Sequence, residues 1–138
     1  MKPSVLFWIV GVLGFLLNLG GFAQMVLYFT ANEVFREGFT AEQLAHVDAL
    51  PAWRSGIWVL GVSSAVIASV LMLLKRSASA PLMFFGLVML LIGMFHDASL
   101  GWFEITGGAG VIMYLFVASQ VTFLWLYARR QNKIGVLR

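Results

Sequence analysis

A few polar residues near the ends of long apolar stretches are the ones that could do chemistry. His96 and Asp97 are adjacent, and Glu104 follows a short distance later. A histidine with two carboxylates can bind a metal ion or relay protons. The only other histidine is His46, however, and no HExxH-like spacing supports a metal site. We therefore expect His96, Asp97 and Glu104 to be solvated charges on an outer surface, where Asp97 or Glu104 can pair with Arg54.

Uncharged polar residues inside the apolar stretches form a second group. Asn18 and Gln24 interrupt the first stretch and Gln120 the last, where Tyr114 also follows a line of small residues. Polar groups at such depth are costly in lipid and tend to face the interior of a helical bundle. One hypothesis is a hydrogen-bonding site for a polar substrate or lipid headgroup. The other is an interhelical clamp, because asparagine side chains hydrogen-bond across helices.

Several kinds of chemistry are disfavoured by what the chain lacks. It has no cysteine, which excludes disulfides, thiolate metal sites and CxxC redox chemistry. Haem is disfavoured because both histidines fall outside the apolar stretches or at their ends. The segment Thr106-Gly107-Gly108-Ala109-Gly110 lacks the GK[ST] ending of a phosphate-binding loop. With no nucleophile–base pair visible either, we expect neither an enzyme nor a cofactor.

Four charge-free stretches must position these residues. Hydrophobic residues make up 61% of the chain and charged residues 11%. About 20 apolar residues are needed to cross the ~30 Å hydrocarbon core of a bilayer as a helix. The stretches show no strand-like alternation, so we predict helices over about 4–31, 53–75, 79–97 and 104–128. The expected fold is an all-α integral membrane protein, with residues 1–138 forming one four-transmembrane-helix bundle.

The connection over residues 32–52 is the only sizeable loop between these helices. Thr40 and Gln43 have the spacing of a capping box, and Pro51 stops any helix that follows. Apolar residues at three-residue spacing between 44 and 50 make such a helix amphipathic. It would lie on the outer interface or form a lid over the bundle.

Charge is segregated between the two faces of the predicted bundle. Four spans place both termini on one side together with the 75–80 turn, and this side carries seven of the nine Lys and Arg residues. All six carboxylates fall on the other side with Arg36 and Arg54. The positive-inside rule then predicts cytoplasmic termini in a bacterial inner membrane. The basic tail, residues 129–138, is expected to meet anionic lipid headgroups, and nothing suggests nucleic acid.

Each predicted helix has a face of small residues that would allow close packing in lipid. The same faces also suit a homo-oligomer or attachment to a larger membrane complex. These faces comprise Gly11, Gly14, Asn18, Gly21, Met25 and Tyr28 in the first helix, Gly61, Ser64, Ala65, Ala68 and Ser69 in the second, Gly86, Gly93 and Asp97 in the third, and Gly107, Gly110, Tyr114 and Ala118 in the fourth.

The chain resembles short bacterial four-helix membrane proteins that are labelled "sugar transporter" and are DoxX-like in appearance. The matching segments cover nearly the full length. They are Leu17-Asn18-Leu19-Gly20-Gly21, Pro51-Ala52-Trp53, Leu71-Met72-Leu73-Leu74-Lys75-Arg76, Tyr127-Ala128-Arg129-Arg130 and Gly135-Val136-Leu137-Arg138. The resemblance implies a four-helix membrane fold and a transport role.

Two functional hypotheses follow. The first is a small transporter or binder of a polar or amphipathic molecule, working as an oligomer, with Asn18, Gln24 and Gln120 lining its site. The alternative is a non-catalytic accessory subunit that packs beside a larger membrane complex.

Overall fold

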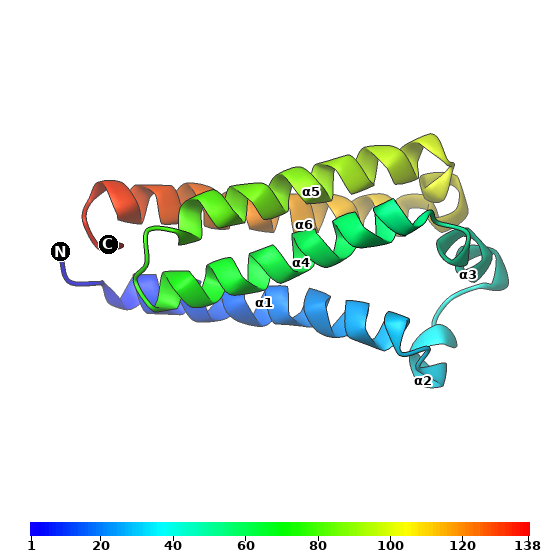
Figure 1. Ribbon diagram of the computed structural model, residues 1–138, viewed down its shortest axis with the longest axis horizontal. Coiled ribbons are helices and arrows are strands. Elements are labelled where there is room, and N and C mark those ends of the chain that lie inside the picture. The colour runs from blue at the N-terminus through cyan, green and yellow to red at the C-terminus, as the bar shows by residue number, and fades with distance from the viewer.

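The structure, a computed structural model, describes residues 1–138 and consists of helices joined by short connections. Four long helices run side by side along its long axis (Figure 1). They are α1 (Val5–Phe29), α4 (Ala52–Leu73), α5 (Ser79–Ser99) and α6 (Trp102–Lys133). Two short helices, α2 (Glu33–Arg36) and α3 (Ala41–Asp48), lie at one end, which we call the loop end. The opposite end, with both chain termini and the 74–78 turn, is the terminal end.

All four long helices are long and apolar enough to cross a membrane. Their most apolar windows have mean hydropathies of 2.1, 2.1, 1.9 and 1.8 in chain order. The chain contains no β-strand. The predicted all-helical fold with four candidate spans is therefore confirmed.

The connections between the helices follow local sequence signals. Thr40 caps α3 and forms the predicted capping box with Gln43, and Pro51 is the N-cap residue of α4. The first turn of α2 is capped by the side chain of Asn32. The last helix differs from the prediction, because α6 continues past residue 128 to Lys133. The first half of the predicted basic tail is therefore helical.

The central element of the bundle is α4. It packs against α5 over most of its length and against α1 on another side, while α5 also packs against α6. Most of the predicted small-residue seam of α1 faces this bundle, because Gly11, Gly14, Asn18 and Met25 are buried, whereas a Cβ atom added at Gly21 would meet nothing within 4 Å. By contrast, α1 approaches α6 at only a few points, one of which is Gly14 against the side chain of Leu124.

The apolar core occupies only the half of the bundle nearest the terminal end. No residue of α6 before Val121 is buried, whereas several beyond that point are. The loop half therefore has to be held by other interactions. The buried core residues are Phe7, Ala65, Ala68, Met72, Ala80, Met83, Leu87, Val121, Leu124, Ala128, Val136 and Leu137.

The glycines near the start of α6 do not pack as the sequence predicts. A Cβ atom added at Gly107 or Gly108 would meet nothing within 4 Å, so the expected close packing at this point is wrong. No other helix approaches these two glycines closely. Gly107 also has φ 62° and ψ −152°, a glycine-only conformation that interrupts the helix.

Close helix contact occurs instead where α4 crosses α5. A Cβ atom on Gly86 would lie 3.1 Å from the carbonyl oxygen of Gly61 and 3.4 Å from the nitrogen of Ala65. Both neighbours are backbone atoms, which cannot move aside as a flexible side chain can. The two helices therefore depend on glycine at this crossing.

We predict that Gly86→Leu lowers the stability of the bundle by about 1–3 kcal/mol, the usual range for overpacking. Thermal unfolding of the detergent-purified protein measures the effect. The control is Gly20→Leu, because Gly20 has no neighbour within 4 Å of an added Cβ. Equal stability of the two variants would contradict the assigned crossing.

Candidate functional site

A buried ion pair joins α4 to α5 near the loop end. The Arg54 Nε donates to Asp97 Oδ1 at 2.9 Å, and Nη2 donates to Oδ2 at 2.6 Å. This is the two-point geometry in which guanidinium and carboxylate bind most specifically. Tyr114 of α6 adds a hydrogen bond from its hydroxyl to Asp97 Oδ2 at 2.5 Å. Three long helices therefore meet at one carboxylate.

The expectation that Asp97 is a solvated outer-loop charge is wrong, since the residue is only 4% exposed. The physical reason is that α5 continues to Ser99, which keeps Asp97 within the helix and turns it toward α4. Gly93, one turn earlier, makes room for the partner. A Cβ atom there would lie 2.8 Å from Arg54 Cζ. The expected pairing of Asp97 with Arg54 is present, whereas Glu104 is exposed and has no part in it.

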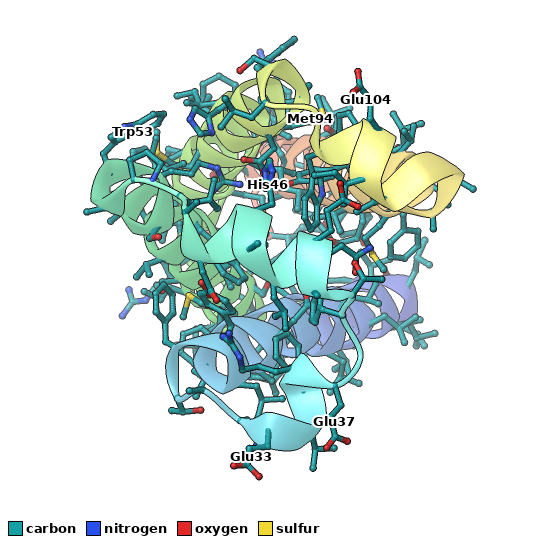
Figure 2. All side chains as sticks on the ribbon, turned by 90° about the vertical axis from the view of Figure 1, so that its right-hand side faces the viewer. Glu33, Glu37, His46, Trp53, Met94 and Glu104 are labelled. Atoms are coloured by element: carbon teal, nitrogen blue, oxygen red, sulfur yellow. The ribbon has the colours of Figure 1, made fainter.

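An imidazole ring lies beside the ion pair, and further aromatic rings lie at the same end of the bundle. His96 Nδ1 lies 3.3 Å from Asp97 Oδ1, and its ring packs edge-to-face with Trp53 at 4.7 Å between centroids. His46 of α3 packs against Trp102 of α6 with 5.0 Å between the ring centroids. Viewed from the loop end, His46 lies over the middle of the bundle rather than at its rim (Figure 2).

His46 has an unusual environment. Its Nε2 atom is the one buried side-chain nitrogen or oxygen that lacks a hydrogen-bond partner. A buried polar atom without a partner costs about 1–3 kcal/mol, and in a native protein it calls for an explanation. A ligand group that hydrogen-bonds to Nε2 would remove this cost.

The helix that carries His46 is tied down by Asp48. This carboxylate accepts hydrogen bonds from Arg36 Nη2 at 2.8 Å and from the Tyr28 hydroxyl at 3.0 Å. The hydrogen bond from Arg36, followed by that from Tyr28, lowers the pKa of Asp48 below its ordinary value. These hydrogen bonds connect α3 with α1 and α2.

A second polar cluster lies deeper, at the middle of the bundle. The amide nitrogen of Asn18 donates to Ser69 Oγ at 2.8 Å and to the Ala65 carbonyl at 3.3 Å. Gln120 Nε2 donates to Asn18 Oδ1 at 3.1 Å. Asn18 thus links α1, α4 and α6, and both ends of its amide group have protein partners. This is the geometry of an interhelical clamp.

The predicted site residues therefore separate into three sets. The loop end brings together Arg54, Asp97, Tyr114 and His96. The clamp consists of Asn18 and Gln120. Gln24 and Glu104 are exposed and join neither group. The sequence does not predict the position of His46 over the bundle, because that position depends on how α3 folds and no residue spacing indicates it.

The loop-end group offers both hydrogen-bond donors and hydrogen-bond acceptors. One guanidinium and one carboxylate make a pair without net charge, which presents both donors and acceptors beside aromatic rings. No group of three His, Cys, Asp or Glu side chains is placed to hold a metal ion. Comparisons with protein-family models, curated proteins and solved structures find no match to this chain.

We predict that Arg54→Met lowers stability by about 3–5 kcal/mol, since it leaves Asp97 buried without a partner. The double variant Arg54→Met/Asp97→Leu should recover much of that loss because neither charge remains. Hydrogen exchange should localise the loosening to the ends of α4 and α5 at the loop end. A double variant no more stable than Arg54→Met would contradict the assigned coupling.

The exposed pair of Arg36 with Asp48 is the control for this experiment. Its side chains are 30% and 46% exposed, and exposed ion pairs contribute only about 0–1 kcal/mol. Arg36→Gln should therefore have a small effect.

Proposed function

We propose that this chain is an integral protein of a bacterial inner membrane, with both termini cytoplasmic, and that it binds and moves a small polar or amphipathic molecule without transforming it. The molecule enters at the loop end and is recognised by Arg54, Asp97 and Tyr114. Because the ion pair has no net charge, the favoured ligand is also uncharged and carries hydroxyl or similar groups.

The observation that carries this proposal is the burial of Arg54 with Asp97 between helices suited to a membrane. Replacing a buried ion pair with apolar residues of similar size is often neutral or stabilising. Stability alone is therefore a weak reason for such a pair. Ionisable residues within membrane helices usually mark substrate pathways or ligand sites.

Two further features support a ligand at this place. The unpartnered Nε2 atom of His46 lies at the loop end, above the same helices. Gly107 interrupts α6 on the loop-end side of Tyr114, and interrupted helices in membrane transporters commonly form substrate sites. Asn18 and Gln120 have a different role in this proposal, as the clamp that closes the bundle below the site.

Uptake into proteoliposomes tests the proposal. The probes are radiolabelled D-glucose, myo-inositol and glycerol as uncharged hydroxyl compounds, with lactate as an anionic comparison. We expect uptake of at least one uncharged probe, and at least a tenfold loss of that uptake in Arg54→Met/Asp97→Leu, equivalent to about 1.4 kcal/mol. His46→Phe, which keeps a ring on Trp102 but removes the unpartnered nitrogen, should weaken uptake without lowering the temperature of thermal unfolding.

Arg36→Gln is again the matched control, since it removes an arginine from the loop end without touching the buried pair. It should transport as the unmodified protein does. Absence of uptake of every probe by the unmodified protein, or equal uptake by the double variant, would contradict the proposal.

A role as an accessory subunit is the second candidate, and one observation favours it. The surface around Gly107 and Gly108 has open space where other helices of the bundle would pack. Close approach of a further helix needs such small residues.

We predict for this candidate that a partner protein, or a second copy of the chain, co-purifies in gentle detergent and is lost on Gly108→Leu. Gly20→Leu is the control because its surroundings are equally open. Native mass spectrometry identifies the species. Recovery of the chain alone in every detergent would exclude the candidate.

A further inference from the structure

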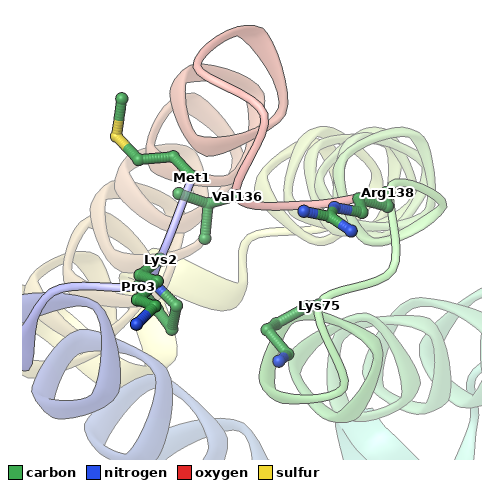
Figure 3. Close-up of a pocket in the computed structure, with 6 residues that line it drawn as sticks. All are labelled: Met1, Lys2, Pro3, Lys75, Val136 and Arg138. Atoms are coloured by element: carbon green, nitrogen blue, oxygen red, sulfur yellow. The ribbon is translucent and has the colours of Figure 1, made fainter.

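The terminal end of the bundle carries a hollow lined by basic side chains. Its volume is about 210 Å³, and Lys2, Lys75 and Arg138 line it together with Met1, Pro3 and Val136. Figure 3 shows Lys75 and Arg138 on one side of the hollow and Lys2 across from them. A neighbouring hollow shares Lys75 and Arg138 and adds Arg76.

Backbone hydrogen bonds hold two of these cations next to each other. The nitrogen of Arg138 donates to the Lys75 carbonyl at 2.8 Å, and the nitrogen of Ser77 donates to the Arg138 carbonyl at 2.9 Å. The final residues are not a loose tail, because Val136 and Leu137 are buried in the apolar core. The chain reaches this position by turning at Gly135, whose φ is +76°.

No acidic side chain balances this positive charge. None of the basic residues of the hollow takes part in an ion pair, and every Asp and Glu of the chain lies toward the loop end. Like charges near one another repel, and an anion between them would offset this repulsion. Arginine and lysine together are a common phosphate-binding combination.

We propose that this hollow is a binding site for the phosphate group of an acidic phospholipid. Basic pockets between membrane helices on the cytoplasmic side bind such headgroups. Lys75 and Arg138 would contact the phosphate oxygens, with Lys2 closing the opposite side. The choice of a lipid as the source of the phosphate rests on the membrane setting proposed above. The hollow shares no residue with the loop-end site, and it is tested by lipid-dependent unfolding rather than by uptake.

Thermal unfolding in lipid nanodiscs tests the proposal. The unmodified protein should unfold at a higher temperature in discs containing phosphatidylglycerol than in discs of phosphatidylcholine alone, because a ligand that binds only the folded state stabilises it. Lys75→Gln/Arg138→Gln should lose at least half of this difference. In phosphatidylcholine discs the variant should unfold at a temperature no lower than that of the unmodified protein, because it loses only mutually repelling charges.

The matched control is Arg129→Gln/Lys133→Gln, which removes the same charge from exposed residues near the same end but outside the hollow. It should keep the full difference. Equal loss in both double variants, or no difference for the unmodified protein, would overturn the site.

Two additional measurements keep the result decisive. Glycerol 3-phosphate added to phosphatidylcholine discs distinguishes a lipid phosphate from a free phosphate. If it stabilises the protein as much as phosphatidylglycerol does, the ligand is a free phosphate and the lipid proposal is wrong. If Lys75→Gln/Arg138→Gln is too unstable for unfolding measurements, native mass spectrometry of the co-purified lipid is used in their place. Retention of phosphatidylglycerol equal to that of the control variant would then contradict the proposal.

Discussion

The ion pair between Arg54 and Asp97 holds together the half of the bundle that has almost no buried apolar side chains. Apart from Met25, the buried hydrophobic residues all lie toward the terminal end. The pair offsets its own desolvation only because its geometry is two-pronged and Tyr114 satisfies a further lone pair. The loop half is therefore specified by a few directional contacts, whereas the terminal half is specified by packing. The two halves should differ in how easily they open.

This division explains why the two halves of α6 differ in burial. Beyond Val121 it packs into the core, but its first half is partly or fully exposed and interrupted at Gly107. A helix segment with few buried contacts can shift at low cost, and ligand sites are commonly built from such segments. The hydroxyl of Tyr114, which is half-buried, is the contact through which this segment meets the ion pair. Movement of α6 would thus change the hydrogen bonds of Asp97 directly.

The long helices and their apolar character could be predicted from the sequence because charge-free stretches of this length have few alternatives. The capping box at Thr40 and the partnership of Arg54 with Asp97 could be anticipated from local signals. The burial of Asp97 could not, since it depends on α5 continuing to Ser99 and on Gly93 leaving space for the guanidinium. Likewise, small residues predict that a helix packs closely, but not which helix it packs against. Gly86 meets α4, while Gly107 meets nothing.

The positions of the two polar clusters set the order of events for any molecule that enters the bundle. Arg54 and Ser69 are separated by roughly 20 Å along α4, at 1.5 Å per residue. A molecule arriving from the loop end therefore reaches the ion pair well before it reaches the Asn18 clamp. Below the clamp lie the packed apolar core and the anchored Val136 and Leu137. Passage through the bundle would need α1 to separate from α4 and α6. The hydrogen bonds of Asn18 to Ser69 and Gln120 are the contacts that would have to break.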